Sequence, residues 1–357
     1  MTSAAYAVTS EGAVQLDQLG VTLIHEHILF DLSFMFMEPE DPAGLEMAGQ
    51  PIRLDNLHWI RIHPASNRDN ARLTDQRDAL NDLRLARQSG VGTVVDVSMR
   101  GEAFAFNPTA IRTIAREAGL TLITGTGYYI EESIPAAVKQ LSTEEICDEM
   151  LRDLNEGYPE AGYCAGVVGE IGTSFPLGPT GEKVLRAAVR AQRQTGAALY
   201  LHPGYSEKAP LELANTAEED GADPGKTIIC HVDSRLRGDQ AVYRELAGRG
   251  FYLGFDTFGR EQYIDFIGRQ HPSDSQRLQW IREVCDAAFV ERVLISTDIC
   301  WKSELVPYGG YGRSHIMKNT VPRMRREGFS EDIIHTILVR NPAAALSRPA
   351  LVREAHR

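Results

Sequence analysis

The chain has 357 residues, of which 43% are hydrophobic and 24% are charged, as in an ordinary globular protein. Its 37 Lys and Arg residues against 49 Asp and Glu residues give a net charge of −12, and no Lys/Arg-rich stretch is present, which argues against nucleic acid as a partner. No run of about 18 apolar residues predicts a transmembrane helix, and the first residues lack the basic start and apolar core of a secretory signal. We therefore expect no membrane association.

The cysteines are odd in number and widely spaced, which predicts buried thiols rather than a disulfide framework. They are Cys147, Cys164, Cys230, Cys285 and Cys300. Cys230 and Cys300 lie near the metal ligands proposed below, but small buried apolar side chains are the expected interpretation for both. This cysteine usage favours a reducing compartment, and we expect a cytoplasmic protein.

Eight apolar or β-branched runs follow one another along the chain, most of them separated by helical patterns. They are residues 21–25, 92–98, 120–126, 165–171, 197–202, 227–231, 251–256 and 292–298. Helices are predicted at about 73–88, after Asn107-Pro108, and at 181–195. Eight strand–helix units predict parallel strands that close into a (β/α)8 TIM barrel of the α/β class. An open doubly wound sheet is disfavoured, because no Gly-x-Gly-x-x-Gly turn follows the first run.

The whole chain, residues 1–357, is predicted to be a single barrel domain with one insertion. The insertion, residues 31–71, follows the first strand on the side where barrel enzymes build their sites. Its Met35, Met37 and Trp59 lead us to expect that it covers the pocket, with a surface decoration as the alternative. A Gly/Tyr-rich loop at 301–315 follows the eighth strand.

Six polar side chains stand at the carboxyl ends of these strands. They are His25, His27, Glu170, His202, His231 and Asp298. His25 and His27 point the same way and Glu26 the other way, because side chains alternate along a strand. Each residue alone fits a strand terminator, a core histidine or an N-cap. Six together, where apolar strands meet loops, predict a buried metal site that pairs their charges.

Six ligands are too many for one catalytic zinc ion, which usually takes three. They suit two divalent metal ions bridged by Glu170 and a hydroxide. His25, His27 and Asp298 would hold one ion, and His202 and His231 the other. Zn²⁺ is the expected metal, with manganese, cobalt and iron as alternatives. Asp298 is the expected catalytic proton acceptor, which passes the proton to the leaving group.

The other histidines lack a strand-end context. We expect surface or helix positions for His58, His63, His271, His335 and His356. His315 is ambiguous, because the loop that precedes it is able to reach the pocket.

The motifs run over almost the whole chain, and include His25-Glu-His27, Gly169-Glu-Ile-Gly172, Leu201-His-Pro-Gly204 and Ser296-Thr-Asp298. With them the chain resembles the phosphotriesterase family of the amidohydrolase superfamily. It is most similar to the phosphotriesterase-related branch, also called resiniferatoxin-binding, particularly at 56–59 and 308–315. This resemblance implies a barrel with a binuclear, usually zinc, centre, a hydrolytic activity and a homodimer.

The resemblance includes one departure. Organophosphate-degrading members and their lactonase relatives carry a carboxylated lysine where this chain, like the related branch, has Glu170. We therefore expect hydrolysis of a carbonyl ester, lactone or amide of a small-molecule substrate, with phosphotriester cleavage as a promiscuous activity. Tyr129 aligns with a tyrosine that contacts the substrate's carbonyl region in lactonase relatives, and is the expected substrate-binding residue together with Arg260.

Two further functions stay open at this point. A deaminase of the same superfamily with a single metal ion would not need Glu170. A non-catalytic ligand-binding protein that retains the barrel cleft would not need an activated water.

Overall fold

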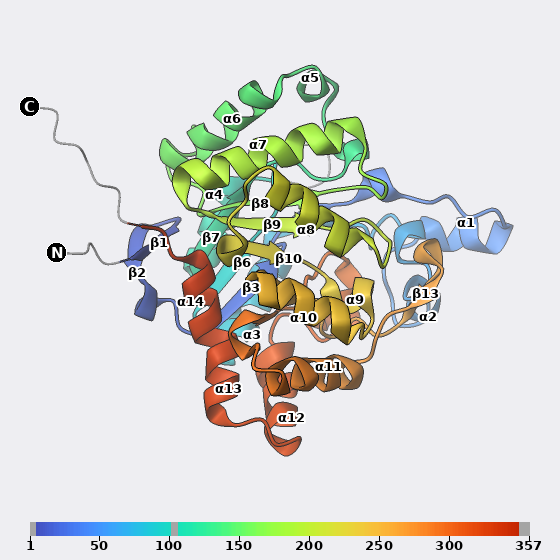
Figure 1. Cartoon of the computed structure of the whole chain (residues 1–357). Helices are drawn as coiled ribbons and strands as arrows, with labels where there is room; N and C mark the ends of the chain where they lie inside the picture. Colours follow the sequence, from blue (N-terminus) through green and yellow to red (C-terminus); the bar gives the residue numbers. More distant parts are fainter. Residues whose placement is uncertain (1–4, 101–105, 350–357) are drawn as a thin grey trace, which may run out of the picture.

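The computed structural model describes residues 5–100 and 106–349. Its centre is a sheet of eight parallel strands, hydrogen-bonded in chain order (Figure 1). The strands are β3 (Thr22–Glu26), β6 (Thr93–Asp96), β7 (Thr121–Thr126), β8 (Val167–Gly172), β9 (Ala198–His202), β10 (Thr227–Ile229), β11 (Tyr252–Phe255) and β14 (Val293–Ile295). Each lies within or next to one of the eight predicted runs, so the predicted (β/α)8 barrel is confirmed.

The first and last strands of the barrel approach each other through loop contacts. The His25 amide donates to Ser296 Oγ at 3.1 Å, and the Asp298 amide donates to the His25 carbonyl at 3.2 Å. These bonds bring two of the predicted ligand strands side by side.

Helices surround the sheet, and several of them cover the near face in Figure 1. The longer ones are α3 (Gln76–Gln88), α4 (Pro108–Ala118), α6 (Thr143–Asn155), α7 (Pro179–Thr195), α8 (Ala209–Glu219), α10 (Gln240–Arg249) and α11 (Asp274–Asp286). The shorter ones are α1 (Pro42–Ala48), α2 (Leu57–Ile60), α5 (Ala136–Lys139), α9 (Val232–Leu236), α12 (Val321–Arg326), α13 (Glu331–His335) and α14 (Asn341–Leu346).

The helix starts follow local capping. Asn107 accepts a hydrogen bond from the Ala110 amide at 2.9 Å, with Pro108 in the first turn, so α4 begins where the sequence predicts. The predicted helix at 73–88 begins later, at Gln76, because Asp75 caps it and Leu73 belongs to the short strand β5 (Arg72–Leu73).

Two apolar layers hold the barrel together. The interior of the barrel is filled by alternate strand residues such as Ile24, Val95, Ile123 and Tyr200. The opposite faces of the strands pack against the helices in a second, larger layer. Because both faces of the sheet are buried, the strands read as nearly continuous apolar runs, which is why the sequence reveals them.

An N-terminal hairpin, β1 (Tyr6–Thr9) and β2 (Gly12–Gln15), packs against the sheet, and its Ala7 belongs to the barrel interior. The Arg348 amide donates to the Tyr6 carbonyl at 2.8 Å, so the two ends of the described chain meet there. Within the described residues, no helix is long and apolar enough to cross a bilayer. All five cysteines are described, and none forms a disulfide.

A buried ion cluster joins the first strand to the Gly/Tyr-rich loop. Glu26 points away from its histidine neighbours and accepts from Thr297 Oγ1 at 2.6 Å. Arg313, in the loop, pairs with Glu26 at 3.3 Å and with Asp82 of α3 at 2.6 Å. Its guanidinium also donates to the His27 carbonyl. All three charged side chains are buried, so the cluster fixes β3 and the loop to each other.

We predict that Arg313→Leu destabilises the fold strongly, because it leaves Glu26 and Asp82 as buried carboxylates without a cation. Breaking a buried pair costs about 3–5 kcal/mol. Urea unfolding followed by circular dichroism measures the change. Arg325→Leu is the control, since Arg325 pairs with Glu331 on the surface and its loss should leave the midpoint nearly unchanged. Equal small shifts for both variants would contradict a structural role of the cluster.

Candidate metal centre

The six predicted ligands lie together where the barrel strands end. His25 is in β3, Glu170 in β8 and His202 in β9, and His231 and Asp298 follow β10 and β14. His27 follows β3 directly. All six are at least 95% buried, although all are polar or charged. The parallel barrel explains this, because the carboxyl ends of all its strands meet at one mouth.

Glu170 occupies the middle of the group and approaches all four imidazoles. Its Oε1 lies 3.4 Å from His27 Nε2. Its Oε2 lies 2.8 Å from His202 Nδ1, 3.4 Å from His231 Nε2 and 3.5 Å from His25 Nε2. One carboxylate thus stands between the two pairs of histidines that the sequence assigns to separate ions.

Asp298 approaches three of these histidines. Its Oδ1 lies 3.3 Å from His27 Nε2 and 3.5 Å from His25 Nε2, and its Oδ2 lies 3.7 Å from His231 Nδ1. Asp298 and His231 both have left-handed backbone, with φ of 48° and 55°. Such values are uncommon outside glycine and cost energy that the surrounding structure must offset, and they cluster at functional sites.

The geometry fits divalent cations. The Nε2 atom of His25 is buried and makes no hydrogen bond to any residue of the described chain, yet two carboxylates lie 3.5 Å away. Ligand atoms of His25, His231 and Asp298 lie within 4.8 Å of one another, as do those of Glu170, His202 and His231. Imidazole nitrogens and carboxylate oxygens are common zinc ligands.

Cys230 also lies within reach of His25 and Glu170. Burial raises the pKa of this thiol to about 12, against the opposing effect of His25. A protonated thiol in the apolar barrel interior fits the small buried side chain that we expected.

Asp256 was missed by the sequence analysis, although it ends the predicted strand at 251–256. Its Oδ1 accepts from the His231 amide at 2.9 Å and lies 2.7 Å from His231 Nδ1. Its Oδ2 lies 3.0 Å from His25 Nδ1. On His27 the corresponding contact is made by Ser98 Oγ, at 3.0 Å from Nδ1. These contacts orient the Nε2 atoms of His25 and His27 toward Glu170 and Asp298, and the Nε2 atom of His231 toward Glu170.

The charges of the site shift the pKa values of its histidines in opposite directions. Burial disfavours the charged form of His231, but Asp256 and Asp298 outweigh it and raise the pKa to about 9. Burial lowers the pKa of His202 to about 4, against the opposing effect of Glu170. A cation at this site would therefore compete with a proton on His231 and find His202 already neutral.

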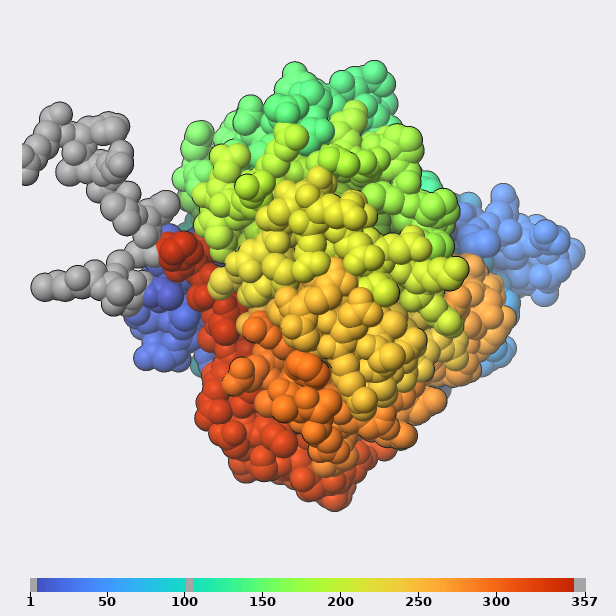
Figure 2. Space-filling model, viewed as in Figure 1, coloured from blue at the N-terminus to red at the C-terminus, as the bar shows by residue number. Residues whose placement is uncertain are grey.

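The ligands border a small cavity of about 40 Å³, lined also by Tyr129, Arg260, Leu32 and Met35. A second cavity of about 270 Å³ adjoins it, and the two share Met35, Tyr129, His202 and Tyr205. Tyr129 OH lies 3.3 Å from His202 Nε2. Leu32 and Met35 belong to the predicted insertion, whose α1 projects from the body of the molecule in Figure 2.

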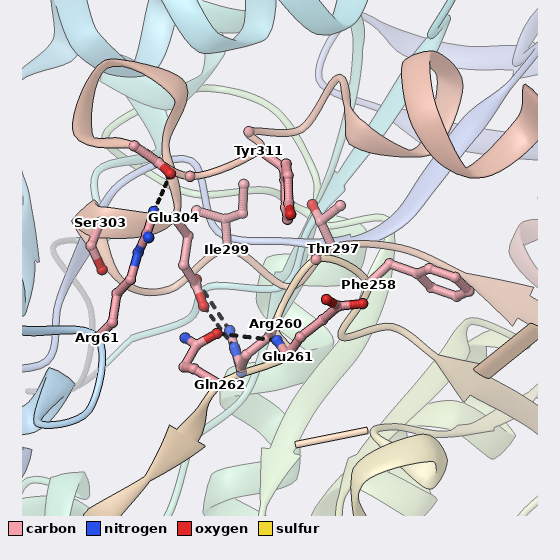
Figure 3. A pocket seen from close by; sticks show the side chains of 14 residues that line it. Arg61, Phe258, Arg260, Glu261, Gln262, Thr297, Ile299, Ser303, Glu304 and Tyr311 are labelled. Atoms are coloured by element: carbon pink, nitrogen blue, oxygen red, sulfur yellow. Dashed lines mark hydrogen bonds and ion pairs between the residues drawn. The ribbon is translucent and has the colours of Figure 1, made fainter. Parts of the chain in front are cut away.

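Arg260 lines the small cavity and also a separate one of about 350 Å³, so it forms a wall between them. Figure 3 shows the Glu304 carboxylate reaching the Arg260 guanidinium, with a distance of 2.7 Å from Nε. Arg260 Nη1 lies 3.3 Å from Asp298 Oδ2, and Nη2 donates to the Asp298 carbonyl at 2.6 Å. The charge of Arg260 is thus matched by two carboxylates, and its role as a substrate contact stays a prediction.

Among the histidines that were not predicted to be metal ligands, one prediction was wrong. His271 was assigned to the surface or a helix, but it is buried and lines the small cavity, because a loop after β11 folds over the mouth. His58 and His335 are exposed on short helices, and His63 is half-buried beside Asp265. His315 pairs with Asp274 at 2.6 Å and does not line the small cavity, and His356 lies outside the described residues.

Comparison with known proteins identifies the family. The model of the phosphotriesterase family matches residues 6–346. The chain belongs to the phosphotriesterase family. It is 35% identical to the N-acetyltaurine hydrolase of Danio rerio, over 93% of this chain and 95% of that protein. It is 34% identical to the phosphotriesterase-related protein of Nematostella vectensis, over 96% of this chain and 98% of that protein.

A solved structure gives the same result for the fold. A resiniferatoxin-binding protein from Rhodobacter sphaeroides has a TM-score of 0.92 and 32% identity, covering 96% of this chain and 94% of that chain. The predicted resemblance is therefore confirmed, and the chain is a metal-dependent hydrolase of the phosphotriesterase family.

We predict that Asp256→Asn weakens metal binding about 10- to 100-fold, the usual cost of losing a carboxylate behind a ligating histidine. The amide is neutral and accepts through one oxygen only, so it cannot serve His25 and His231 together. Competition with a chelator of known affinity measures the loss. Asp286→Asn, at the exposed end of α11, is the matched control. Unchanged metal affinity in Asp256→Asn would contradict the orienting role.

Proposed function

We propose that this hydrolase uses two divalent cations to cleave the amide bond of a small N-acyl compound. The observation that carries the proposal is the position of Glu170, within 3.5 Å of all four histidines. His25, His27 and Asp298 would hold one cation and His202 and His231 the other, with Glu170 between them. Bound there, the cations would supply an activated water and polarise the substrate's carbonyl oxygen.

The protein's own groups would handle the proton. Despite burial, His231 and Arg260 lower the pKa of Asp298, so the carboxylate is ionised at neutral pH and is able to accept a proton. The contacts from Arg260 to both the carboxylate and the backbone carbonyl of Asp298 hold it toward the ligands. We propose that Asp298 takes a proton from the attacking water and delivers it to the departing amine.

The relatives favour an amide over the other carbonyl substrates. Proteins named N-acetyltaurine hydrolase from several animals and from Dictyostelium discoideum match at least 93% of this chain at 31–35% identity. The amine of an amide is a poor leaving group unless its nitrogen is protonated. Asp298, once it has taken a proton from the water, is able to supply that proton. We place Tyr129, beside His202 at the shared wall of both cavities, next to the substrate's carbonyl.

The metal count separates this proposal from a deaminase with a single metal ion. We predict two ions per chain, with Zn²⁺ as the proposed metal, and about one or none in Glu170→Gln, because the neutral amide no longer joins the two ligand sets. Inductively coupled plasma mass spectrometry of the purified proteins measures the ratio. Glu156→Gln, at an exposed helix end, should keep both ions. A fully active protein with one ion per chain would exclude the binuclear site.

For catalysis we predict that Asp298→Asn lowers kcat for N-acetyltaurine by about 10²- to 10⁴-fold, the usual contribution of a general acid–base group. The assay uses saturating metal, and metal content is determined on the same sample. An activity loss that merely follows lost metal would refute the proton-transfer role.

A parallel panel of a lactone, a carboxylic ester and a phosphotriester tests the substrate class. Faster turnover of any of these compounds than of amides would contradict the proposed amide substrate.

The remaining parts of the proposal concern the setting of the enzyme. Unpaired thiols in all five cysteines fit a reducing compartment, and we propose a cytoplasmic location. We propose a homodimer from the family resemblance, testable by light scattering. We also propose that the insertion at 31–71 covers the pocket, because its Leu32 and Met35 line the small cavity.

A further inference from the structure

Arg235 is a buried arginine at the small cavity without an acidic partner. It is 4% exposed, and within residues 5–100 and 106–349 it makes no ion pair with a carboxylate. The neighbouring arginines differ in this respect. Arg260 pairs with Glu304, and Arg277 pairs with Asp233 and Asp274 at 2.6 and 2.9 Å.

Neutral groups hold the Arg235 side chain in place. Nε donates to the carbonyls of Pro203 and Gly204 at 3.0 and 3.2 Å, and Nη1 donates to Ser234 Oγ at 2.8 Å. The guanidinium carbon lies 4.1 Å from the centre of the Tyr205 ring. These contacts orient the group without neutralising its charge, and Nη2 donates to no residue of the described chain. A buried charge of this kind is costly unless a ligand completes it.

The position of Arg235 ties it to the metal centre. It lies one turn of α9 beyond His231, and its amide donates to the His231 carbonyl at 3.0 Å. The carbonyls that hold its side chain follow His202 directly in the chain. The guanidinium is thus fixed relative to both proposed ligands of one cation, as a substrate-orienting group must be.

The surroundings add a second polar group that lacks a partner. His271 is buried in the same cavity, and its Nδ1 has no hydrogen-bond partner among the described residues. Burial, and then the charges of Arg260, Arg277 and Arg235, lower the pKa of His271 well below its usual value. A neutral imidazole adds hydrogen-bonding capacity without adding a carboxylate, so this side of the cavity keeps a positive charge.

We propose that Arg235 is the specificity-determining residue of this enzyme and binds an anionic group, a carboxylate or sulfonate, on the substrate. This inference rests on the proposed function for the bond that is cleaved, and adds that the molecule carries an acid group beside the amide. Arginine presents several N–H donors in a plane, which matches the oxygens of either anion. Neutral amides of the same length lack this contact and are poor substrates.

The kinetic test compares three acetamides of similar length: N-acetyltaurine, N-acetyl-β-alanine and the neutral N-acetyl-β-alaninamide. The wild-type enzyme should prefer at least one acid over the neutral compound. Arg235→Gln should lower kcat/KM for that acid by roughly 10- to 150-fold, the range for a charged hydrogen bond, mainly through KM. The neutral compound should change less than about threefold. Comparison of the two acids identifies the anion.

Two variants control for structure. Arg237→Gln, an exposed arginine two residues along the chain, should behave as wild type. Arg235→Lys keeps the charge without the planar fork and should give an intermediate preference, even if the Gln variant folds poorly. Equal losses for charged and neutral substrates would show that Arg235 only supports the loop after His202, and would overturn the proposal. A wild-type preference for the neutral compound would also overturn it.

A binding measurement separates this inference from the proposed reaction. Isothermal titration calorimetry with propane-1-sulfonate and with butyrate uses metal-loaded and chelator-treated protein. Binding that is lost in Arg235→Gln but retained in Arg237→Gln supports the anion site, even if no amide is hydrolysed and the proposed function fails. Binding that depends on the metal and is equal in both variants would assign the anion to the metal centre and refute the role of Arg235.

Discussion

The carboxylate of Asp256 is the constraint on which the rest of the site depends. It contacts the Nδ1 atoms of His25, in β3, and of His231, which follows β10. Each imidazole has two nitrogens, and a carboxylate behind one of them determines which one faces the centre. Without Asp256, the rings of His25 and His231 would lose the contact that turns their Nε2 atoms toward Glu170.

Buried charge at the mouth is arranged in separate paired sets. Glu26 and Asp82 share Arg313, and Asp233 and Asp274 share Arg277. These sets support the loops, since removing one member leaves an uncompensated charge in a dry environment. Arg235 differs from these arginines, because it makes no ion pair with a carboxylate of the described residues. Chemistry with external ions and molecules is expected where the protein's own charges do not balance.

The sequence predicts the strands and the ligands well because both follow from simple periodicity. A strand buried on two faces is a continuous apolar run, and the parallel barrel places every run's last residue at one mouth. Asp256 was within reach of the same argument, because it also ends a run. Asp256 contacts the Nδ1 atoms of His25 and His231, whose Nε2 atoms face Glu170. A pattern of strand ends does not show which imidazole nitrogen a carboxylate contacts.

Other features depend on the tertiary structure and were not predictable. The sequence predicts a surface or helix position for His271, and the residue is buried only because the segment after β11 folds over the mouth. Arg235 reads as an ordinary surface charge on a short helix. Its proposed importance comes from having no carboxylate partner among residues 5–100 and 106–349, and this is a property of three-dimensional packing. Specificity therefore resides where sequence patterns are least informative.

The meeting of Tyr6 and Arg348 at the end of the barrel opposite the mouth has a practical consequence. Tyr6 and Arg348 pair through their backbones beside the β1–β2 hairpin, and the Arg348 side chain donates to the Gly166 carbonyl at 3.0 Å, at the end of the sheet where β8 begins. The mouth lies at the opposite ends of the same strands. An enzyme tethered to a surface next to Tyr6 or Arg348 would face its cleft toward the solution. A short peptide bridge across the same two residues, with new chain ends opened in a loop elsewhere, would give a circular permutant in which the bridge does not cross the path of a substrate.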